Sequence, residues 1–284
     1  MNILVLGGNG YLGTKIVNML AEEGHTVYCT IRDEKIRELY SGNNIKGITP
    51  DYKELNGYFK NVHFDLIFNA ACNYGRSEVI YGDVIEANIE FPLKVLDSAV
   101  ANGVKNYITI GTGLPDRLNM YSYSKKMFSE FGRFYVEKKF INFINMKLEM
   151  FYGYDEPADR FIPSTIRKML RGDVVNVTAG TQHRDIICID DILKAIKAVI
   201  NSQLKGYHEV FVGTGVAPTI SELIDYMWEK SGKKSIVNKG AIPMRPNEPD
   251  CVADTSVLCS LTEWNPIYWK DGIGNMIDRI SGNL

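Results

Sequence analysis

The sequence contains no apolar run that approaches the roughly 20 residues needed to span a bilayer. It also lacks a sustained basic stretch, since 34 Asp and Glu residues nearly balance 32 Lys and Arg residues and leave a formal net charge of −2. Neither a membrane nor a nucleic acid is therefore the expected partner, although a local basic pocket for a phosphorylated small molecule is compatible with this balance. The 284 residues suffice for one large α/β domain, or for a nucleotide-binding domain with a smaller neighbour.

Cysteine is scarce, and its spacing shows no pairing. The five cysteines are scattered without a C-x-x-C pattern, at Cys29, Cys72, Cys188, Cys251 and Cys259. This usage is typical of reduced thiols in a cytosolic protein, and we expect no zinc or other metal site. We expect no signal peptide either, because an apolar segment of strand character begins already at residue 2. Together these features predict a cytoplasmic protein.

A glycine-rich turn near the N-terminus is the most informative pattern in the chain. It follows the short apolar segment at residues 2–6, and Gly7, Gly10 and Gly13 give it a G-x-x-G-x-x-G spacing. Glycines at these positions permit a tight turn, the close approach of a pyrophosphate, and close packing of the next helix on the strand. Because the turn joins a strand to a helix, it predicts a dinucleotide site rather than an ordinary structural turn.

The elements after this turn predict a doubly wound parallel sheet of the Rossmann type. A helix expected over residues 11–23 places the N–H groups of Tyr11 and Leu12 at its N-terminus, where they favour a phosphate. Strands and helices then alternate to about residue 150, which is typical of a sheet that binds ligands beyond the carboxyl ends of its strands. The expected strands cover residues 26–31, 45–49, 65–69, 107–110 and 141–148, and the expected helices cover residues 33–40, 51–59, 83–102 and 124–138.

The end of the second expected strand indicates which dinucleotide is bound. NAD-binding chains usually place an acidic residue there, on the ribose 2′-hydroxyl. Here the position falls on Ile31, and Arg32 follows it. Because a guanidinium can pair with a 2′-phosphate, the sequence predicts NADP(H) rather than NAD. The alternative is that Arg32 covers a solvated surface, with the acidic Asp33 one residue later.

A turn-rich break after residue 151 predicts a second domain. We expect residues 1–150 to bind the dinucleotide and residues 151–284 to form a smaller α/β lobe that binds the substrate. Within this lobe, residues 184–200 have the pattern of a strand followed by a helix, which we expect to return to the main sheet. Further helices are expected over residues 160–170 and 220–230.

The residues between 121 and 125 carry a candidate proton relay. Tyr121 and Lys125 lie four residues apart at the start of an expected helix, so both side chains share one face. A phenol has a pKa of about 10, and a lysine ammonium one turn away favours the phenolate. The pair is thus suited to proton transfer near neutral pH, and the preceding dinucleotide motif makes this reading more specific than the pair alone.

The order of these motifs resembles the extended short-chain dehydrogenase/reductase family, which includes nucleotide-sugar epimerases, dehydratases and reductases. The resemblance covers essentially the whole chain. Its motifs are Gly7, Gly10 and Gly13; Asn69-Ala70-Ala71; Asn88; Tyr121 with Lys125; Tyr152-Gly153; Arg184-Asp185; Asp190-Asp191; and Arg245 with Glu248.

The resemblance implies a role for each matching position. Tyr121 would be the catalytic acid/base, Lys125 would bind the nicotinamide ribose, and Thr112 would hydrogen-bond the substrate oxygen. Cofactor contacts are implied for Asn69, Ala70, Ala71 and Asn88. Substrate contacts are implied for Arg184 and Arg245 on the nucleotide diphosphate and for Glu248 on a ribose hydroxyl. Ordinary turn chemistry at Thr112 and a surface ion pair at Arg184 are the structural alternatives.

Departures from the family narrow the expected reaction. Dehydratases of this family carry Asp-Glu after the catalytic threonine, where this chain has Gly113-Leu114, so dehydration is not expected. The chain is most similar to the group that reduces 4-keto-deoxysugars on CDP. The resemblance therefore implies NADPH-dependent reduction of a nucleotide-linked 4-keto-6-deoxyhexose, in the biosynthesis of a surface polysaccharide such as O-antigen, by a homodimer.

Two other functions remain open. A nucleotide-sugar 4-epimerase with tightly bound NAD needs the same threonine, tyrosine and lysine, but Arg32 argues against it. A non-catalytic NADP-sensing protein would have no need of the Tyr121 and Lys125 pair.

Overall fold

The computed structural model describes residues 1–40, 42, 44–75, 81–202, 204–246 and 248–282. The chain forms two compact units. The first comprises Met1–Lys147 and Asn201–Val210, and the second comprises Leu148–Ile200 and Phe211–Leu284. The first unit is therefore discontinuous in sequence, because a short later segment returns to it.

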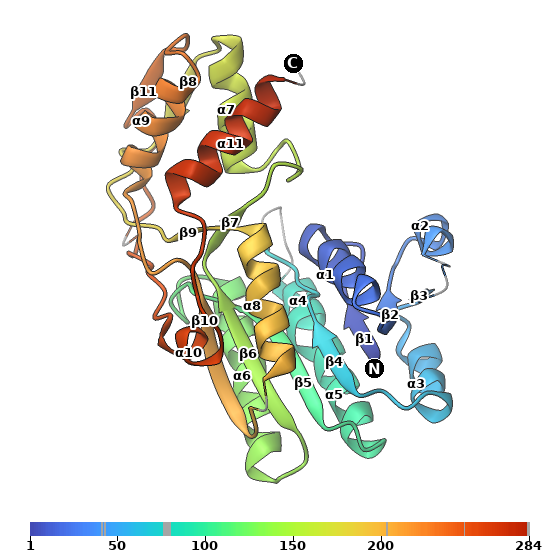
Figure 1. Cartoon of the computed structure of the whole chain (residues 1–284). Coiled ribbons are helices and arrows are strands. Elements are labelled where there is room, and N and C mark those ends of the chain that lie inside the picture. The colour runs from blue at the N-terminus through green and yellow to red at the C-terminus, as the bar shows by residue number, and fades with distance from the viewer. Residues whose placement is uncertain (41, 43, 76–80, 203, 247, 283–284) are drawn as a thin grey trace. The chain divides into compact units, whose positions relative to one another are not determined.

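A seven-stranded sheet organises the first unit, in the order β10-β6-β5-β4-β1-β2-β3 (Figure 1). The pairs β1–β2, β2–β3, β1–β4 and β4–β5 are parallel. The predicted Rossmann sheet is thus confirmed. Its elements are β1 (Asn2–Leu6), α1 (Tyr11–Glu22), β2 (Thr26–Thr30), α2 (Glu34–Leu39), β3 (Ile45–Ile48), α3 (Tyr52–Asn61), β4 (Leu66–Asn69), α4 (Tyr81–Ile85), η1 (Glu86–Glu90), α5 (Phe91–Ala101), β5 (Asn106–Thr112), α6 (Met120–Glu137), β6 (Asn142–Leu148) and β10 (Tyr207–Val212).

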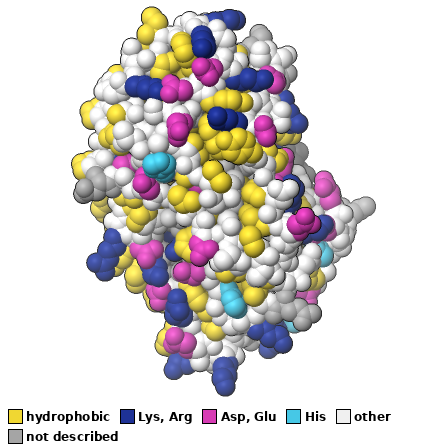
Figure 2. Space-filling model, turned by 60° about the vertical axis from the view of Figure 1, so that its left-hand side comes forward, with side chains coloured by type: hydrophobic (Ala, Val, Ile, Leu, Met, Phe, Trp, Pro, Cys, Tyr) yellow, Lys and Arg dark blue, Asp and Glu magenta, His cyan; other side chains and the backbone are white. Residues whose placement is uncertain are grey.

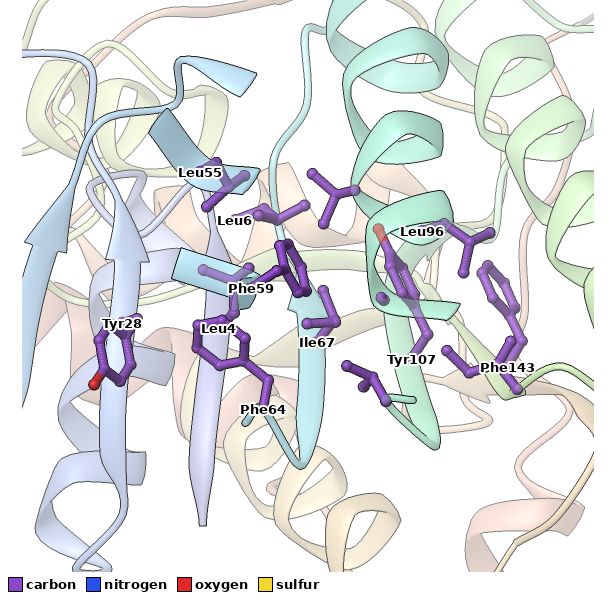
Figure 3. Packing of buried hydrophobic residues seen from close by; sticks show 14 of the residues in the cluster. Leu4, Leu6, Tyr28, Leu55, Phe59, Phe64, Ile67, Leu96, Tyr107 and Phe143 are labelled. Carbon is purple, nitrogen blue, oxygen red and sulfur yellow. The ribbon is translucent and has the colours of Figure 1, made fainter. Parts of the chain in front are cut away.

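One face of this sheet is covered by α3, α5 and α6. Alternate side chains of β1, Leu4 and Leu6, point to this face and join a buried cluster with Phe59 of α3 and Leu96 of α5 (Figure 3). Helix α1 packs on β1 and β2, and its residues are absent from this cluster. Burial of each large apolar side chain stabilises the folded state by about 1.5–3 kcal/mol. The packing of this layer therefore holds the strands of the sheet, and their ends, in place.

The predicted long helix over residues 83–102 is interrupted in the structure. A π-helical turn, η1, lies between α4 and α5 and contains Asn88. Pro92 occupies the first turn of α5 and has no N–H to donate to the carbonyl of Asn88 four residues earlier. The missing hydrogen bond at Pro92 therefore coincides with a π turn, a feature often found at functional sites.

The second unit has two small parallel sheets and its own apolar core. Strand β7 pairs with β9, and β8 pairs with β11. Its core cluster includes Ile166, Leu223 and Ile277, which come from three different helices. Its elements are β7 (Met150–Tyr152), α7 (Phe161–Arg171), β8 (Val175–Val177), β9 (Ile186–Cys188), α8 (Ile189–Asn201), α9 (Ile220–Lys230), β11 (Val237–Lys239), α10 (Ser256–Leu261) and α11 (Trp269–Ser281).

The prediction that residues 184–200 return to the main sheet is wrong. Strand β9 is only three residues long and pairs with β7, and the strand that joins the main sheet is β10. Strand β10 was missed because it is only half-buried and carries polar residues, His208 and Glu209, between its apolar ones. Strand β10 pairs with β6 at the edge of the sheet, and its own residues give no local sign of this pairing.

No helix in the described ranges is long and apolar enough to cross a membrane. On the face drawn in Figure 2, basic and acidic side chains are interspersed, and no field of one sign covers it. That face therefore offers no continuous basic surface of the kind that binds nucleic acid.

Candidate active site

The glycine turn lies between β1 and α1, and its glycines have two different roles. Gly7 has a φ of +77°, and a Cβ there would lie 2.8 Å from Ala71 Cα. A Cβ on Gly13 would lie 2.1 Å from the Gly7 carbonyl oxygen. A Cβ on Gly10 would meet only that same oxygen, at an ordinary 3.5 Å. Gly7 and Gly13 are thus required by packing within the protein, whereas Gly10 faces open space.

The start of α1 fits an anionic group. Its N-cap is Gly10, which has no side chain to accept a hydrogen bond from the first-turn N–H groups. Tyr11 and Leu12, the first two residues of the helix, are half-buried. Helix N-termini of this form bind phosphate through backbone N–H groups and the helix dipole. The residues present therefore fit the pyrophosphate of a dinucleotide.

The end of β2 contributes two side chains of different exposure. Thr30 is buried, and its Oγ1 accepts a 2.9 Å hydrogen bond from the Gly7 N–H. Sequence reasoning overlooked Thr30, since a threonine in a strand gives no signal of this contact. Arg32 lies just beyond and is exposed, while Ile31 before it is completely buried. An exposed guanidinium at this place is free to approach a ribose or its phosphate.

The end of β4 is held by two buried asparagines. Asn69 Oδ1 accepts the N–H of Ala71 at 3.1 Å. Asn88 Oδ1 accepts the Asn73 N–H at 2.7 Å, and its Nδ2 donates to Asn73 O and to Ser124 Oγ, both at 2.9 Å. Both asparagines are 1% exposed. Their hydrogen bonds therefore hold the backbone around residues 70–73.

The predicted Tyr121 and Lys125 pair lies in the first turns of α6. This helix begins earlier than predicted, with Asn119 as N-cap in a reciprocal capping box with Ser122. Lys125 is 5% exposed, and its Nζ donates to the Ala71 carbonyl oxygen at 3.2 Å. Burial lowers the pKa of this ammonium, while the nearby Cys72 opposes the shift. The structure therefore brings Lys125 directly to the end of β4, where Ala70 and Ala71 stand.

Tyr121 and Thr112 complete this group in the first unit. The Tyr121 ring packs against Tyr74, with ring centroids 4.9 Å apart. Thr112 ends β5, and its Oγ1 accepts the Leu114 N–H at 3.2 Å, which leaves the hydroxyl proton for another acceptor. Thr112 and Lys125 line one small cavity. Tyr74 was not predicted, because an aromatic residue in a loop has no distinguishing spacing.

The three residues predicted to bind the nucleotide part of the substrate lie in the second unit. Arg184 is 7% exposed and donates to Glu248 Oε1 at 2.5 Å and to the carbonyl of Pro249. Its side chain thus attaches residues 248–249 to the segment that precedes β9. Arg245 is exposed. Two of the three residues, Arg184 and Glu248, are therefore brought together, and they satisfy each other's charge.

Two aspartates of the motifs Arg184-Asp185 and Asp190-Asp191 have structural partners. Asp185 is fully buried, and its carboxylate accepts N–H groups of Thr214, Gly215 and Ala253. Asp191 is also fully buried and accepts from Lys194 at 2.7 Å and from the Ile267 N–H at 2.8 Å. In the described parts of the chain, no group of three or more His, Cys, Asp or Glu side chains could hold a metal.

The chain belongs to the NAD dependent epimerase/dehydratase family, whose model matches residues 3–213. It is 28% identical over 272 residues to a CDP-abequose synthase of Salmonella muenchen, with 91% of each chain covered. It is 25% identical over 306 residues to a UDP-glucose 4-epimerase of Rhizobium meliloti, with 94% of this chain and 93% of that protein covered. The predicted family is therefore confirmed.

A solved structure agrees with the fold. The UDP-glucose 4-epimerase of Thermus thermophilus in complex with NAD gives a TM-score of 0.83, with 100% of both chains covered. The sequence identity is 19%, so this likeness establishes the fold alone.

Proposed function

We propose that the protein reduces the keto group of a nucleotide-linked 4-keto-6-deoxyhexose with NADPH. The observation that carries this proposal is the convergence of Lys125 on the carbonyl of Ala71, beside Thr112 and one helical turn from Tyr121. Family membership and the likeness to a CDP-abequose synthase support a nucleotide sugar as substrate. We place the reaction in the cytoplasm, where it would supply a deoxysugar for a surface polysaccharide.

The side chains of the first unit have complementary roles in this reaction. When bound, the reduced nicotinamide supplies a hydride to the carbonyl carbon of the sugar. Tyr121 donates its phenolic proton to the carbonyl oxygen, and the Thr112 hydroxyl donates a hydrogen bond to the same oxygen. The Lys125 ammonium stabilises the phenolate that Tyr121 becomes, and it binds the ribose next to the nicotinamide.

The cofactor preference follows from Arg32 and the start of α1. The first-turn N–H groups would bind the pyrophosphate, with Gly10 open to its approach. Arg32 is exposed after the buried Ile31, where it would pair with a 2′-phosphate. Asn69 and Asn88 would act by holding the backbone of Ala70 and Ala71 against the nicotinamide half.

The second unit would bind the nucleotide. Arg245, which is exposed, would pair with the diphosphate. Arg184 binds Glu248 through Nη2, and its Nη1 donates to Pro249 O, His183 O and Cys251 Sγ. Its Nε–H and the second Nη2–H would add a second contact to the diphosphate. Glu248 keeps one carboxylate oxygen for a ribose hydroxyl, because its ion pair with Arg184 uses the other.

A nucleotide-sugar 4-epimerase is the second candidate. The likeness to the Rhizobium meliloti UDP-glucose 4-epimerase extends over 94% of the chain, and such an enzyme would use the same Thr112, Tyr121 and Lys125. It would keep NAD bound and regenerate it in each turnover. Arg32 distinguishes the two candidates, because an NAD-specific ribose site favours a carboxylate.

The deciding experiment follows NADPH oxidation by absorbance with CDP-, dTDP- and GDP-linked 4-keto-6-deoxysugars, with NADH in parallel. Stoichiometric consumption of NADPH with one of them supports the reductase and identifies the base. Conversion of a nucleotide sugar to its 4-epimer without added cofactor supports the epimerase instead. NADPH binding with neither reaction would favour a non-catalytic sensor.

A further inference from the structure

Asn145 of β6 lies at the inner end of a chain of hydrogen bonds in the first unit. Its Nδ2 donates to Ser129 Oγ at 2.9 Å, and Ser129 Oγ lies 2.6 Å from Tyr207 Oη. Tyr207 Oη in turn donates to Glu209 Oε1 at 2.8 Å. The chain thus connects three elements, β6, α6 and β10, and ends at a carboxylate.

The carboxylate fixes the direction of every proton in this chain. Glu209 lies near Lys147, at 3.7 Å, and the hydrogen bond from Tyr207 and the neighbouring cations lower the pKa of its carboxyl group against the effect of burial. The ionised carboxylate can only accept, so the single proton of Tyr207 goes to it. Ser129 must then donate to Tyr207, and its remaining lone pairs must accept from Asn145. The amide of Asn145 therefore has one allowed orientation.

In this orientation, Asn145 Oδ1 points toward a small cavity that Asn145 helps to line. The oxygen is buried and has no hydrogen-bond partner among the described residues. Room for it exists because residue 111 is glycine, where a Cβ would lie 2.3 Å from the oxygen. The cavity has a volume of about 10 Å³, which suffices for one water molecule. Its lining consists of Gly111, Thr112, Asp116, Ser122, Lys125, Lys126, Asn145 and Lys147.

The side-chain donors that line this cavity are two hydroxyl groups and three lysine ammonium groups. Ser122 already donates to Asn119 O, and the proposed reaction assigns the single Thr112 proton to the substrate oxygen, which leaves the lysines. Lys126 is already paired with Glu130 at 2.9 Å and lies 3.8 Å from Asp116. Lys147 is paired with Glu209. Lys125 is the most buried of the three and donates to one backbone carbonyl, that of Ala71. Because an ammonium has three donors, Lys125 has the greatest need of a further acceptor.

We propose that this cavity binds one water molecule that accepts from the Lys125 ammonium and donates to Asn145 Oδ1. Asn145 is then a positioning residue, which fixes Lys125 from the side of β6 while Ala71 fixes it from β4. The water also gives the buried ammonium a second acceptor, which stabilises its charged form. The consequence for catalysis rests on the proposed function, but the water site itself does not.

The first test needs neither substrate nor cofactor. A crystal structure of the full chain at a resolution that resolves ordered water should show one within hydrogen-bonding distance of both Asn145 Oδ1 and Lys125 Nζ. A dry cavity, or an Asn145 amide turned with Nδ2 toward it, would overturn the proposal.

The second test measures the titration of Lys125 by NMR of the lysine side chains in two variants. Asn145→Leu removes the acceptor, so we expect the pKa of Lys125 to fall. Asn145→Asp keeps the shape and adds a charge, so we expect that pKa to rise. A purely structural disturbance would move both variants in the same direction, and that result would contradict the proposal. Lys126→Met is the matched control, because it removes a neighbouring cation and leaves Asn145 in place.

The catalytic consequence is measured separately. Asn145→Leu should lower kcat by about tenfold, with the KM for the sugar nucleotide unchanged, and Asn145→Asp should restore part of the rate. If the reductase function fails but the water and the opposite NMR shifts are found, the water site stands without its role in reduction.

Discussion

Lys125 is a charged side chain that the fold buries almost completely, and its burial lowers the pKa of its ammonium. We expect Lys125→Met to abolish activity while raising the melting temperature at neutral pH, because the buried charge is removed. The unfolded chain binds the proton more tightly than the folded chain, so wild-type stability rises with pH between the lowered pKa and the ordinary value of 10.5. Thermal unfolding of both proteins against pH should therefore show their difference narrowing as pH rises through this window.

Tyr121 is the residue whose loss should separate chemistry from binding. Tyr121→Phe keeps the ring that packs on Tyr74 and removes only the proton donor. We expect kcat to fall about 10²- to 10⁴-fold, with dinucleotide binding retained when measured by fluorescence titration. Unchanged turnover in this variant would sink the assignment of Tyr121 as the acid. Tyr123→Phe is the control, since Tyr123 lies on the same helix with its ring exposed.

Arg32 should determine the choice between the two dinucleotides. Charge-assisted hydrogen bonds contribute about 1.5–3 kcal/mol, so Arg32→Ala should raise the KM for NADPH about 10- to 100-fold. The KM for NADH should change little, because NADH lacks the 2′-phosphate. An equal loss with both cofactors would show that Arg32 supports the fold rather than the phosphate.

Arg184 and Glu248 are both predicted site residues, and they form an ion pair in the second unit. Their side chains are 9% and 16% exposed. Arg184→Met leaves the Glu248 charge uncompensated, and we expect a loss of about 2–4 kcal/mol in the free energy of unfolding by urea. The double variant Arg184→Met, Glu248→Leu should recover much of that loss, since both charges are then gone. Failure of the second substitution to recover stability would show that the contacts of Arg184 with backbone carbonyls matter more than the ion pair.

At the scale of elements, the start of α6 matters because it carries Tyr121 and Lys125. Asn119→Ala removes the N-cap that accepts from Ser122 N–H, at a cost of about 1 kcal/mol. We expect a drop in kcat as well, since fraying of the first turn displaces Tyr121. Asp51→Ala, which uncaps α3, should cost similar stability and leave kcat unchanged. Equal kcat in both variants would mean that the cap serves stability alone.

Elements with a strong local pattern were predictable, and elements made by distant packing were not. The strands up to residue 148 are short apolar runs bounded by turns, which sequence periodicity detects. Helix α11 was missed because it contains Gly272 and Gly274, and glycine costs a helix about 1 kcal/mol per residue. The structure explains Gly272, because a Cβ there would lie 1.7 Å from Tyr152 Oη. Packing against a residue 120 positions away thus outweighs local preference.

The candidate site was predictable to a similar extent. Motif spacing indicated Tyr121, Lys125 and the glycine turn, and their roles stay predictions until activity is measured. No spacing indicated that Asn88 would hold Asn73, or that Arg184 would pair with Glu248 64 residues later. Such contacts depend on how the chain returns in space, and a single sequence carries no local trace of them.

At the scale of the whole molecule, the discontinuity of the first unit bears on how the chain is made. One of the two edge strands of its sheet, β10, lies more than fifty residues after its neighbour β6 in the sequence. During synthesis the hydrogen-bonding edge of β6 therefore stays open until β10 has left the ribosome, well after the dinucleotide turn is complete. Open strand edges invite pairing with other chains, so a nascent or truncated protein ending near residue 150 would be prone to aggregate. The segment at residues 201–210 thus completes the sheet late in synthesis. The predicted cofactor-binding and catalytic residues of the first unit all precede this segment in the sequence.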